Sequence, residues 1–291
     1  MKVSGFTFVR NAVLYDYPVV EAIQSILPVC DEVVVAVGNS EDETLELIKN
    51  ITSAKIRIIE TIWDESLRIG GKVLAVETDK AFHAISHDAD WAFYIQGDEV
   101  VHEKYLDVIR SEMEAYKDDD KVDGLLFKYH HFYGSYDYVG LSSRWYRREI
   151  RIIKNNKDIF SYKDAQGFRK KPNEKLRVKL IDAYIHHYGH VREPQAMQRK
   201  HQSTNRFWHS DRWIKRNIKP ASEFDYSNYE PLGLYEGTHP HIMEKRISNM
   251  DWKFEYDVSQ RQFEFKDRIK NFTQKLTGWR PGEYRNYKLI R

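Results

Sequence analysis

Short apolar runs alternate with segments of helical period through the first hundred residues. The strand-like runs cover 3–9, 33–37, 56–59 and 91–95. The run at 33–37 is continuously apolar, which is typical of a strand buried on both faces. Between the runs, apolar residues recur at helical spacing, for example at Ala22, Ile23 and Ile26. This alternation predicts a mostly parallel sheet with helices on both faces.

The second half of the chain has a different pattern. After a helical segment at 103–116, aromatic strand-like runs cover 124–133 and 149–153. A segment at 242–276 returns to helical period, and the tail at 279–284 is rich in aromatic and turn residues. No internal repeat or low-complexity linker separates these parts, so we predict one compact fold whose tail folds back onto it or onto a second subunit.

Composition narrows the class of protein. The chain of 291 residues is 41% hydrophobic and 31% charged, with a formal net charge of +2, which argues against a disordered chain and against a nucleic-acid-binding protein. No apolar run reaches the ~20 residues that cross a bilayer, and the N-terminus lacks the layout of a signal peptide. Cys30 is the only cysteine, so no intrachain disulfide can form, and we expect a cytoplasmic protein.

Three loops follow predicted strands at the sheet edge where ligands bind in open α/β folds. They hold Arg10 and Asn11, the segment 38–44, and the segment 96–99. Ser40 and Asp42 offer a hydroxyl and a carboxylate before a predicted helix, where they would contact a nucleotide or simply cap that helix.

The third loop contains two adjacent acids, Asp98 and Glu99, directly after an apolar strand, and Gly97 lets the backbone approach a ligand. A carboxylate at this position suits a divalent cation, which binds protein oxygens and substrate phosphates together. Such an ion neutralises the charge on a departing nucleoside diphosphate. The alternative is a solvated turn followed by the acidic first turn of a helix.

The order of these motifs resembles that of family-2-type glycosyltransferases, which have the GT-A fold. In that family the first strand ends in an Asn-containing loop, similar to 9–11 here, and the second loop ends in Ser-x-Asp-x-Thr, matched by 40–44. The fourth strand ends in Asp-x-Asp, which Gln96-Gly97-Asp98 resembles with Gln in the first place. The match covers about the first third of the chain strongly and the rest loosely.

The resemblance implies an α/β, GT-A-like fold with a mostly parallel sheet flanked by helices. The glycosyltransferase domain would span 1–240, with a nucleotide-sugar-binding half at 1–100 and an aromatic-rich acceptor half at 101–240. Residues 241–291 would form a helical C-terminal extension.

The resemblance also implies a donor site for a nucleotide sugar, with a UDP-sugar as the first expectation, and Mn2+ or Mg2+ as cofactor. Asp98 would be a metal ligand. The nucleotide-sugar-binding residues would be Val9, Arg10, Asn11, Asn39, Ser40, Asp42, Gln96 and Gly97. Val37 and Gly38 stand where the family commonly has an acid that reads the base, and Gln96 removes a charge near the metal.

Inverting members of the family have an acid on the acceptor side of the sugar. In related enzymes, a histidine from late in the sequence often binds the metal. Asp164 is the candidate for the catalytic base, ahead of Glu149 and Glu174. His187, within the cluster 186–190, fits the metal-binding histidine best, although a structural histidine is the alternative. His130 and His131 would line an acceptor groove or alternate between the faces of a strand.

These observations predict a metal-dependent, inverting glycosyltransferase that moves a sugar to a carbohydrate or glycolipid acceptor, in the setting of polysaccharide biosynthesis. One alternative is a sugar-phosphate nucleotidyltransferase, although the segment 8–11 lacks the Gly-rich basic loop of those enzymes. Another alternative is a non-catalytic relative that binds carbohydrate or nucleotide. This alternative stands because Gln96 replaces the first acid of the Asp-x-Asp motif. The sequence also leaves two other possibilities open: that the protein contacts a membrane peripherally, and that it forms a homodimer.

Overall fold

The computed structural model describes residues 1–67, 69–218, 221–227, 231–260 and 263–290. The strands are β1 (Val3–Val9), β2 (Glu32–Gly38), β3 (Ile56–Thr61), β4 (Trp91–Tyr94), β5 (Glu99–Val101), β6 (Gly124–Tyr133), β7 (Tyr138–Gly140), β8 (Arg148–Lys154), β9 (Ile159–Tyr162), β10 (Gly167–Lys170), β11 (Glu174–His190), β12 (Leu232–Leu234) and β13 (Tyr287–Leu289). The α-helices are α1 (Val19–Ile26), α2 (Thr44–Lys49), α3 (Lys72–Ala84), α4 (Leu106–Tyr116), α5 (Pro194–Asn205), α6 (Asp211–Asn217), α7 (Glu244–Ser248) and α8 (Phe265–Thr277). In these ranges, no helix combines the length and apolar character that crossing a membrane requires.

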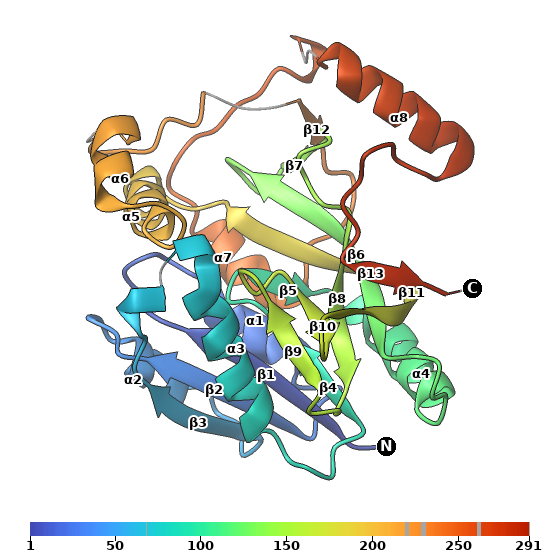
Figure 1. Ribbon diagram of the computed structural model, residues 1–291. Helices are drawn as coiled ribbons and strands as arrows, with labels where there is room; N and C mark the ends of the chain where they lie inside the picture. The colour runs from blue at the N-terminus through green and yellow to red at the C-terminus, as the bar shows by residue number, and fades with distance from the viewer. Residues whose placement is uncertain (68, 219–220, 228–230, 261–262, 291) are drawn as a thin grey trace.

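The strands form one sheet in the order β3-β2-β1-β4-β8-β6-β11-β10-β9 (Figure 1). The first four strands of this path are parallel, as predicted. The remainder of the sheet is mixed, so the prediction of a mostly parallel sheet holds only in part. There β6 and β11 pair in parallel, but β8 lies antiparallel between β4 and β6, and β9 and β10 form a hairpin. Helices connect the early strands and allow parallel pairing, whereas the short turn between β9 and β10 imposes an antiparallel pair. The fold is therefore a mixed α/β fold.

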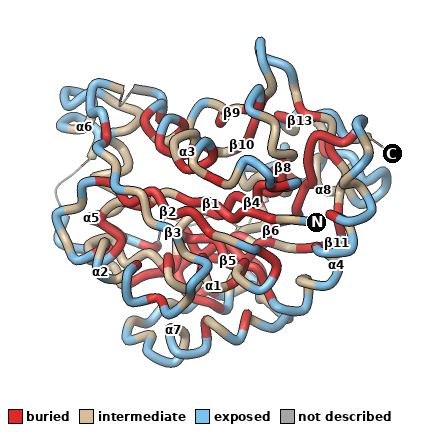
Figure 2. Tube along the Cα trace, turned by 90° about the horizontal axis from the view of Figure 1, so that it is seen from below, coloured by how far each residue is buried: buried red, intermediate tan, exposed pale blue. Residues whose placement is uncertain are grey.

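Both faces of the parallel strands are covered, which confirms the interpretation of the apolar run at 33–37. Val33, Val35 and Val37 contribute to a core with α1, α2 and α4, whereas Val34 and Ala36 face a second core with α3. Successive side chains of a strand point to opposite faces, so the sheet separates these two cores. Figure 2 shows the buried strands β1, β2 and β4 with α3 on one side and α1 on the other.

The C-terminal segment is only partly helical. The segment 242–276 was predicted as a helix, but α7 and α8 are separated by a stretch in which Phe254 and Tyr256 pack with Tyr138 in an aromatic cluster. The tail folds back onto the main body, as expected. Arg147 binds Glu283 at 2.7 Å, and β13 pairs in parallel with β11.

A fully buried ion pair joins the two halves of the sheet. Arg151 on β8 donates from Nε and Nη2 to the two carboxylate oxygens of Glu99 at 2.7 Å each, and the Tyr129 hydroxyl donates to the same carboxylate at 2.8 Å. Burial alone would lower the pKa of the guanidinium, but Glu99 raises it well above its usual range. The rings of Tyr94 and Tyr129 lie against the guanidinium, so this charge is fully enclosed.

We predict that Arg151→Met lowers the free energy of unfolding by about 3–5 kcal/mol, because Glu99 would become a buried, unpaired charge. Urea unfolding followed by circular dichroism measures this change. Arg151→Met combined with Glu99→Gln removes both charges and should be less destabilising than the single variant. Lys128→Met is the control, since it breaks an exposed pair with Asp182 and should cost less than about 1 kcal/mol. Equal costs for the Arg151 and Lys128 variants would contradict the prediction.

Candidate active site

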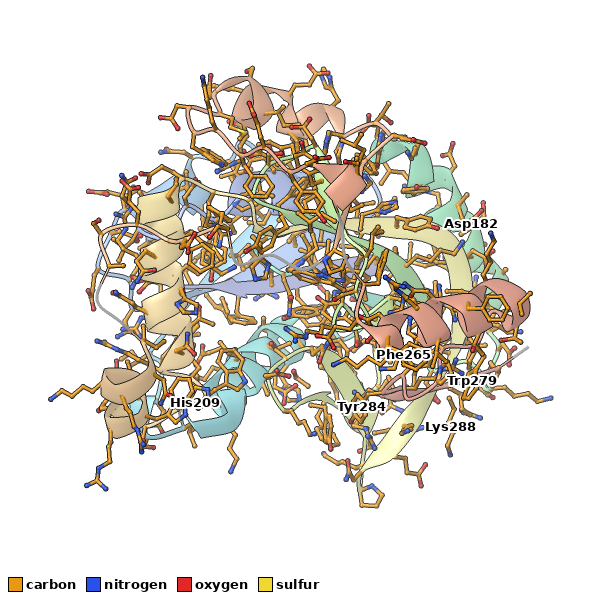
Figure 3. The ribbon with its side chains drawn as sticks, turned by 90° about the horizontal axis from the view of Figure 1, so that it is seen from above. Asp182, His209, Phe265, Trp279, Tyr284 and Lys288 are labelled. Carbon is orange, nitrogen blue, oxygen red and sulfur yellow. The ribbon has the colours of Figure 1, made fainter. Side chains whose placement is uncertain are left out.

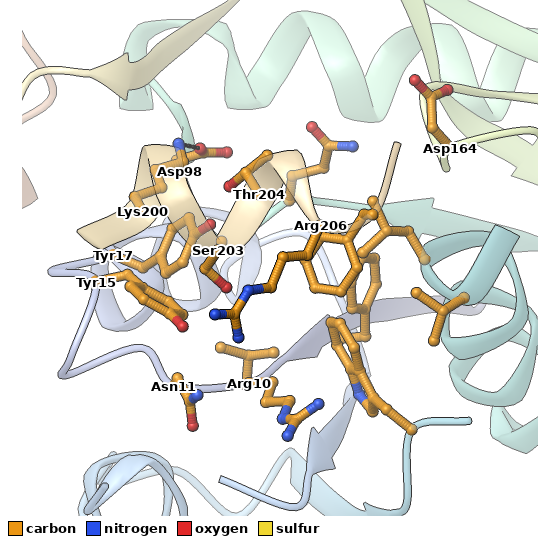
Figure 4. Close-up of a pocket in the computed structure, with 18 of the residues that line it drawn as sticks. Arg10, Asn11, Tyr15, Tyr17, Asp98, Asp164, Lys200, Ser203, Thr204 and Arg206 are labelled. Carbon is orange, nitrogen blue, oxygen red and sulfur yellow. Dashed lines mark hydrogen bonds and ion pairs between the residues drawn. The ribbon is translucent and has the colours of Figure 1, made fainter. Parts of the chain in front are cut away.

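A cavity of about 780 Å³ lies at the carboxyl edge of β1 and β4 (Figure 4). The loops after these two strands form one side of it, and α5 and the turn between β9 and β10 form the others. The residues predicted for the site that line the cavity are Val9, Arg10, Asn11, Gln96, Gly97, Asp98, Asp164 and His187. The topology thus brings residues from both halves of the chain to one place.

A buried lysine, Lys200, lies beside Asp98 and was not predicted from the sequence. The Lys200 ammonium on α5 donates to Asp98 Oδ2 at 2.9 Å and to the carbonyl oxygen of Gly189 at 2.8 Å. Burial raises the pKa of Asp98, but the charges beside it, the Lys200 ammonium first among them, more than offset this and hold it well below its usual range. Burial lowers the pKa of Lys200 to about 8, and Arg192 adds to this shift. Lys200 lies on a polar helix without hydrophobic periodicity, so no sequence signal marked it.

The tautomer of His187 follows from its hydrogen bonds. His131 Nε2 lies 2.6 Å from the carbonyl oxygen of Tyr146, and because a carbonyl only accepts, His131 donates from Nε2. Burial lowers the pKa of both histidines, which favours their neutral forms. His131 Nδ1 then accepts from His187 Nδ1 at 2.9 Å, which leaves a lone pair on His187 Nε2. That lone pair faces Asp98 Oδ1 at 3.7 Å.

Asp98 and His187 are suitable donors for a divalent cation. A carboxylate oxygen and a neutral imidazole nitrogen lie near each other without a proton between them, so a cation would satisfy both. Among the described residues, no group of three or more His, Cys, Asp or Glu side chains is arranged to hold a metal ion. A cation bound here would therefore take further ligands from elsewhere, as Mg2+ does when it binds one or two carboxylates together with substrate phosphates.

Gln96 holds the turn that carries Asp164. Its Nε2 donates to the carbonyl oxygen of Ala165 at 3.1 Å, which an ionised aspartate at this position could not do. The turn is tight, with φ of 57° at Lys163 and 63° at Ala165. It fits against Gly71 at the start of α3, where an added Cβ would lie 2.6 Å from the Asp164 Cβ. The departure from the Asp-x-Asp motif therefore has a structural consequence, which is to fix the Asp164 turn.

Asn39, Ser40 and Asp42 join the loops after β1 and β2. Asn11 N donates to Ser40 Oγ at 3.0 Å, and Leu14 N donates to the Asp42 carboxylate at 2.7 Å. The carbonyl oxygen of Asn39 accepts from Arg10 Nε at 3.1 Å. These three residues are not among the described residues that line the cavity, so their contacts orient Arg10 and Asn11, which do line it.

The other carboxylates considered as a base lie elsewhere. Burial raises the pKa of the Glu149 carboxyl to about 8, and Glu174 is exposed at the start of β11. Neither is among the described residues lining the cavity, whereas Asp164 is. Figure 4 shows Asp164 at the opposite end of the cavity from Asp98 and Lys200.

Aromatic side chains form one wall of the cavity and were also missed. Phe8, Trp63 and Phe207 are in contact, with ring centroids 5.8 Å and 5.7 Å apart for the two pairs that include Trp63. The Arg10 guanidinium lies 5.6 Å from the Trp63 ring. Trp63 follows β3. Its position after a third parallel strand was the sequence signal that could have placed it at the cavity. Such a wall suits the flat face of a base or a sugar.

No family model matches the chain, and no curated protein matches it in sequence. Among solved structures, Staphylococcus aureus TarS 1–349 is 12% identical, with a TM-score of 0.39, over 70% of this chain and 64% of that one. The 4-diphosphocytidyl-2C-methyl-D-erythritol synthase of Anaerococcus prevotii is 11% identical, with a TM-score of 0.33, over 53% of this chain and 70% of that one.

A third similar structure is glucosyl-3-phosphoglycerate synthase from Mycobacterium tuberculosis in complex with Mn2+, UDP and glucosyl-3-phosphoglycerate. It is 16% identical, with a TM-score of 0.31, over 46% of this chain and 45% of that one. The chain thus spans less than two thirds of the length of the TarS structure. These similarities are too distant to assign a family or an activity.

We predict that His131→Phe weakens Mn2+ binding about 10–100-fold, because His187 loses the partner that fixes its tautomer. Phenylalanine keeps the flat ring that lies on Tyr129 and Trp145. Electron paramagnetic resonance of free Mn2+, titrated in the presence of UDP, measures the affinity. His130→Phe is the matched control, since His130 stacks on Tyr184 instead, and it should bind Mn2+ as the wild type does. The same affinity in both variants would argue against the role of His131.

Proposed function

We propose that this protein is a glycosyltransferase that takes its sugar from a nucleoside-diphosphate sugar, with Mn2+ or Mg2+ held by Asp98 and His187. The layout of the cavity carries the proposal. One end has a carboxylate, a free imidazole nitrogen and a lysine ammonium, and the other has the Asp164 carboxylate. The span between them leaves room for a sugar flanked by its leaving group and its acceptor.

The end near Asp98 is suited to a diphosphate. When bound, a divalent ion would neutralise the negative charge on the departing diphosphate. Lys200, Arg10 and Arg206 also line the cavity and supply positive charge from the protein itself. Such charges stabilise a leaving group most when the surroundings are already in place, as the buried position of Lys200 provides.

The aromatic wall is suited to the nucleoside. Trp63 would take the flat face of a base, and Arg10 and Asn11 would supply polar contacts beside it. A UDP-sugar remains our first expectation for the donor, and a carbohydrate or glycolipid for the acceptor.

Asp164 would be the base of an inverting transfer. The acceptor hydroxyl attacks the anomeric carbon, its proton passes to the Asp164 carboxylate, and the bond from that carbon to the diphosphate breaks on the opposite side. Gln96 and Gly71 support this role, because they hold the Asp164 turn at the edge of the cavity.

We predict that UDP binds more tightly with Mn2+ than with EDTA, and that Asp98→Asn removes most of this difference. An amide is a poorer ligand for a hard cation than a carboxylate. Isothermal titration of UDP into the wild type and the variant, each with Mn2+ and with EDTA, measures the effect. Equal affinity in all four titrations would exclude the metal role of Asp98.

We predict that Asp164→Asn lowers the transfer rate about 10²-fold or more while the affinity for the donor changes little, because a base acts in the transition state. A panel of nucleotide sugars and acceptors provides the assay, and NMR of the product should show inverted anomeric configuration. Glu149→Gln is the control, since the amide replaces a carboxyl whose raised pKa keeps it protonated at neutral pH. An Asp164→Asn protein with the full transfer rate would end this assignment.

A further inference from the structure

Helix α8 exposes its apolar side chains to solvent. Phe265, Ile269, Phe272 and Leu276 are 78%, 49%, 66% and 69% exposed. With 3.6 residues per turn, these four positions fall within roughly 60° around the helix axis, so they form one narrow stripe. Trp279, just beyond the helix, is also exposed. Figures 1 and 3 show α8 at the outer edge of the molecule.

The opposite side of α8 is polar and contacts the body of the protein. Asp267 is buried and accepts a hydrogen bond from Ser143 N at 3.3 Å, and Lys270 Nζ donates to Ser143 Oγ at 3.2 Å. Gln274 accepts from Arg280 Nε at 2.7 Å. An amphipathic helix that packs only on its own domain turns its apolar stripe inward. The reversed orientation of α8 indicates that its apolar stripe meets something other than this chain.

Basic side chains border the stripe. Lys266 lies on one side of it, and Arg268 and Lys275 lie on the other, all three exposed. Asp267, the acid within the helix, is buried on the opposite face. Glu264, which precedes the helix, pairs with Lys266 at 2.7 Å. An apolar centre with lysine and arginine at its edges is the pattern of a helix that lies in a membrane interface.

We propose that α8 docks the protein on the surface of a bilayer that contains anionic lipids. The apolar stripe enters the boundary between headgroups and acyl chains, and the basic residues contact the negative headgroups. Thirteen residues span about 20 Å, which is shorter than the hydrocarbon core, so α8 lies along the surface. A second copy is disfavoured as the occupant, because packing two α8 stripes together would bring like charges at both edges close to each other. This proposal does not depend on the proposed transferase activity.

Co-sedimentation with two kinds of vesicle tests the proposal. The wild type should sediment with vesicles of phosphatidylcholine and phosphatidylglycerol, less so with phosphatidylcholine alone, and binding should weaken as salt is raised. Phe272→Ser should bind the vesicles about tenfold more weakly or worse, because it removes a large apolar side chain that would be buried in the membrane interface. Ile62→Ser is the matched control, because Ile62 is 77% exposed but lies after β3, and it should bind as the wild type does.

Thermal melting and a charge-reversal variant distinguish loss of membrane binding from loss of the fold. Thermal melting of each variant verifies that the fold is intact, as expected for changes at exposed positions. Lys266→Glu combined with Lys275→Glu should abolish the preference for vesicles that contain phosphatidylglycerol and leave the melting temperature unchanged. Wild-type protein that fails to sediment with anionic vesicles at low salt would overturn the proposal. A dimer in analytical ultracentrifugation that Phe272→Ser dissociates, without vesicle binding, would assign the stripe to a second copy instead.

Discussion

The bidentate contact between Arg151 and Glu99 is the constraint on which the geometry of the cavity depends. Two charges without access to water are tolerable only when each is paired and hydrogen-bonded, so neither side chain can move independently. The Glu99 carboxylate also accepts from the backbone N–H of Gln96, and Arg151 donates to the carbonyl oxygen of Gln166. The loop after β4 and the turn that carries Asp164 are therefore both positioned by one guanidinium, although about 70 residues separate them.

The functional side chains themselves depend on a small number of neutral polar contacts. His131 orients His187 from the adjacent strand, and Gln96 holds the Asp164 turn. Both contacts join segments far apart in the chain, and the one between the histidines is buried, where a hydrogen bond is costly to lose. Such contacts hold the side chains in place without a ligand, and on the proposed function this preorganisation would favour electrostatic stabilisation of a leaving group.

Hydrophobic periodicity was sufficient to predict the parallel half of the fold, because each strand there is a local apolar run followed by a helix. It also predicted that the loops at 10–11 and 96–99 meet, since parallel strands share a carboxyl edge. The insertion of β8 between β4 and β6 could not be predicted, because strand order in that half depends on contacts far apart in sequence. Lys200 was missed because it lies on a polar helix without hydrophobic periodicity and 102 residues after Asp98. For the segment 242–276, the period predicted a helix but not that α8 exposes Phe265 and Phe272 to solvent.

On the proposed assignment, Lys200 has a consequence for how the protein would acquire a metal. Its ammonium already neutralises Asp98, so the folded chain contains no uncompensated acid at this place and needs no ion in order to fold. Folding would thereby not depend on metal supply, unlike in small zinc domains that unfold when the ion is removed. On the proposed assignment, two protein donors hold an ion weakly, and the donor phosphates supply the remaining oxygens. Metal and nucleotide would then bind as one unit, and occupancy by the ion would follow the concentration of the donor substrate.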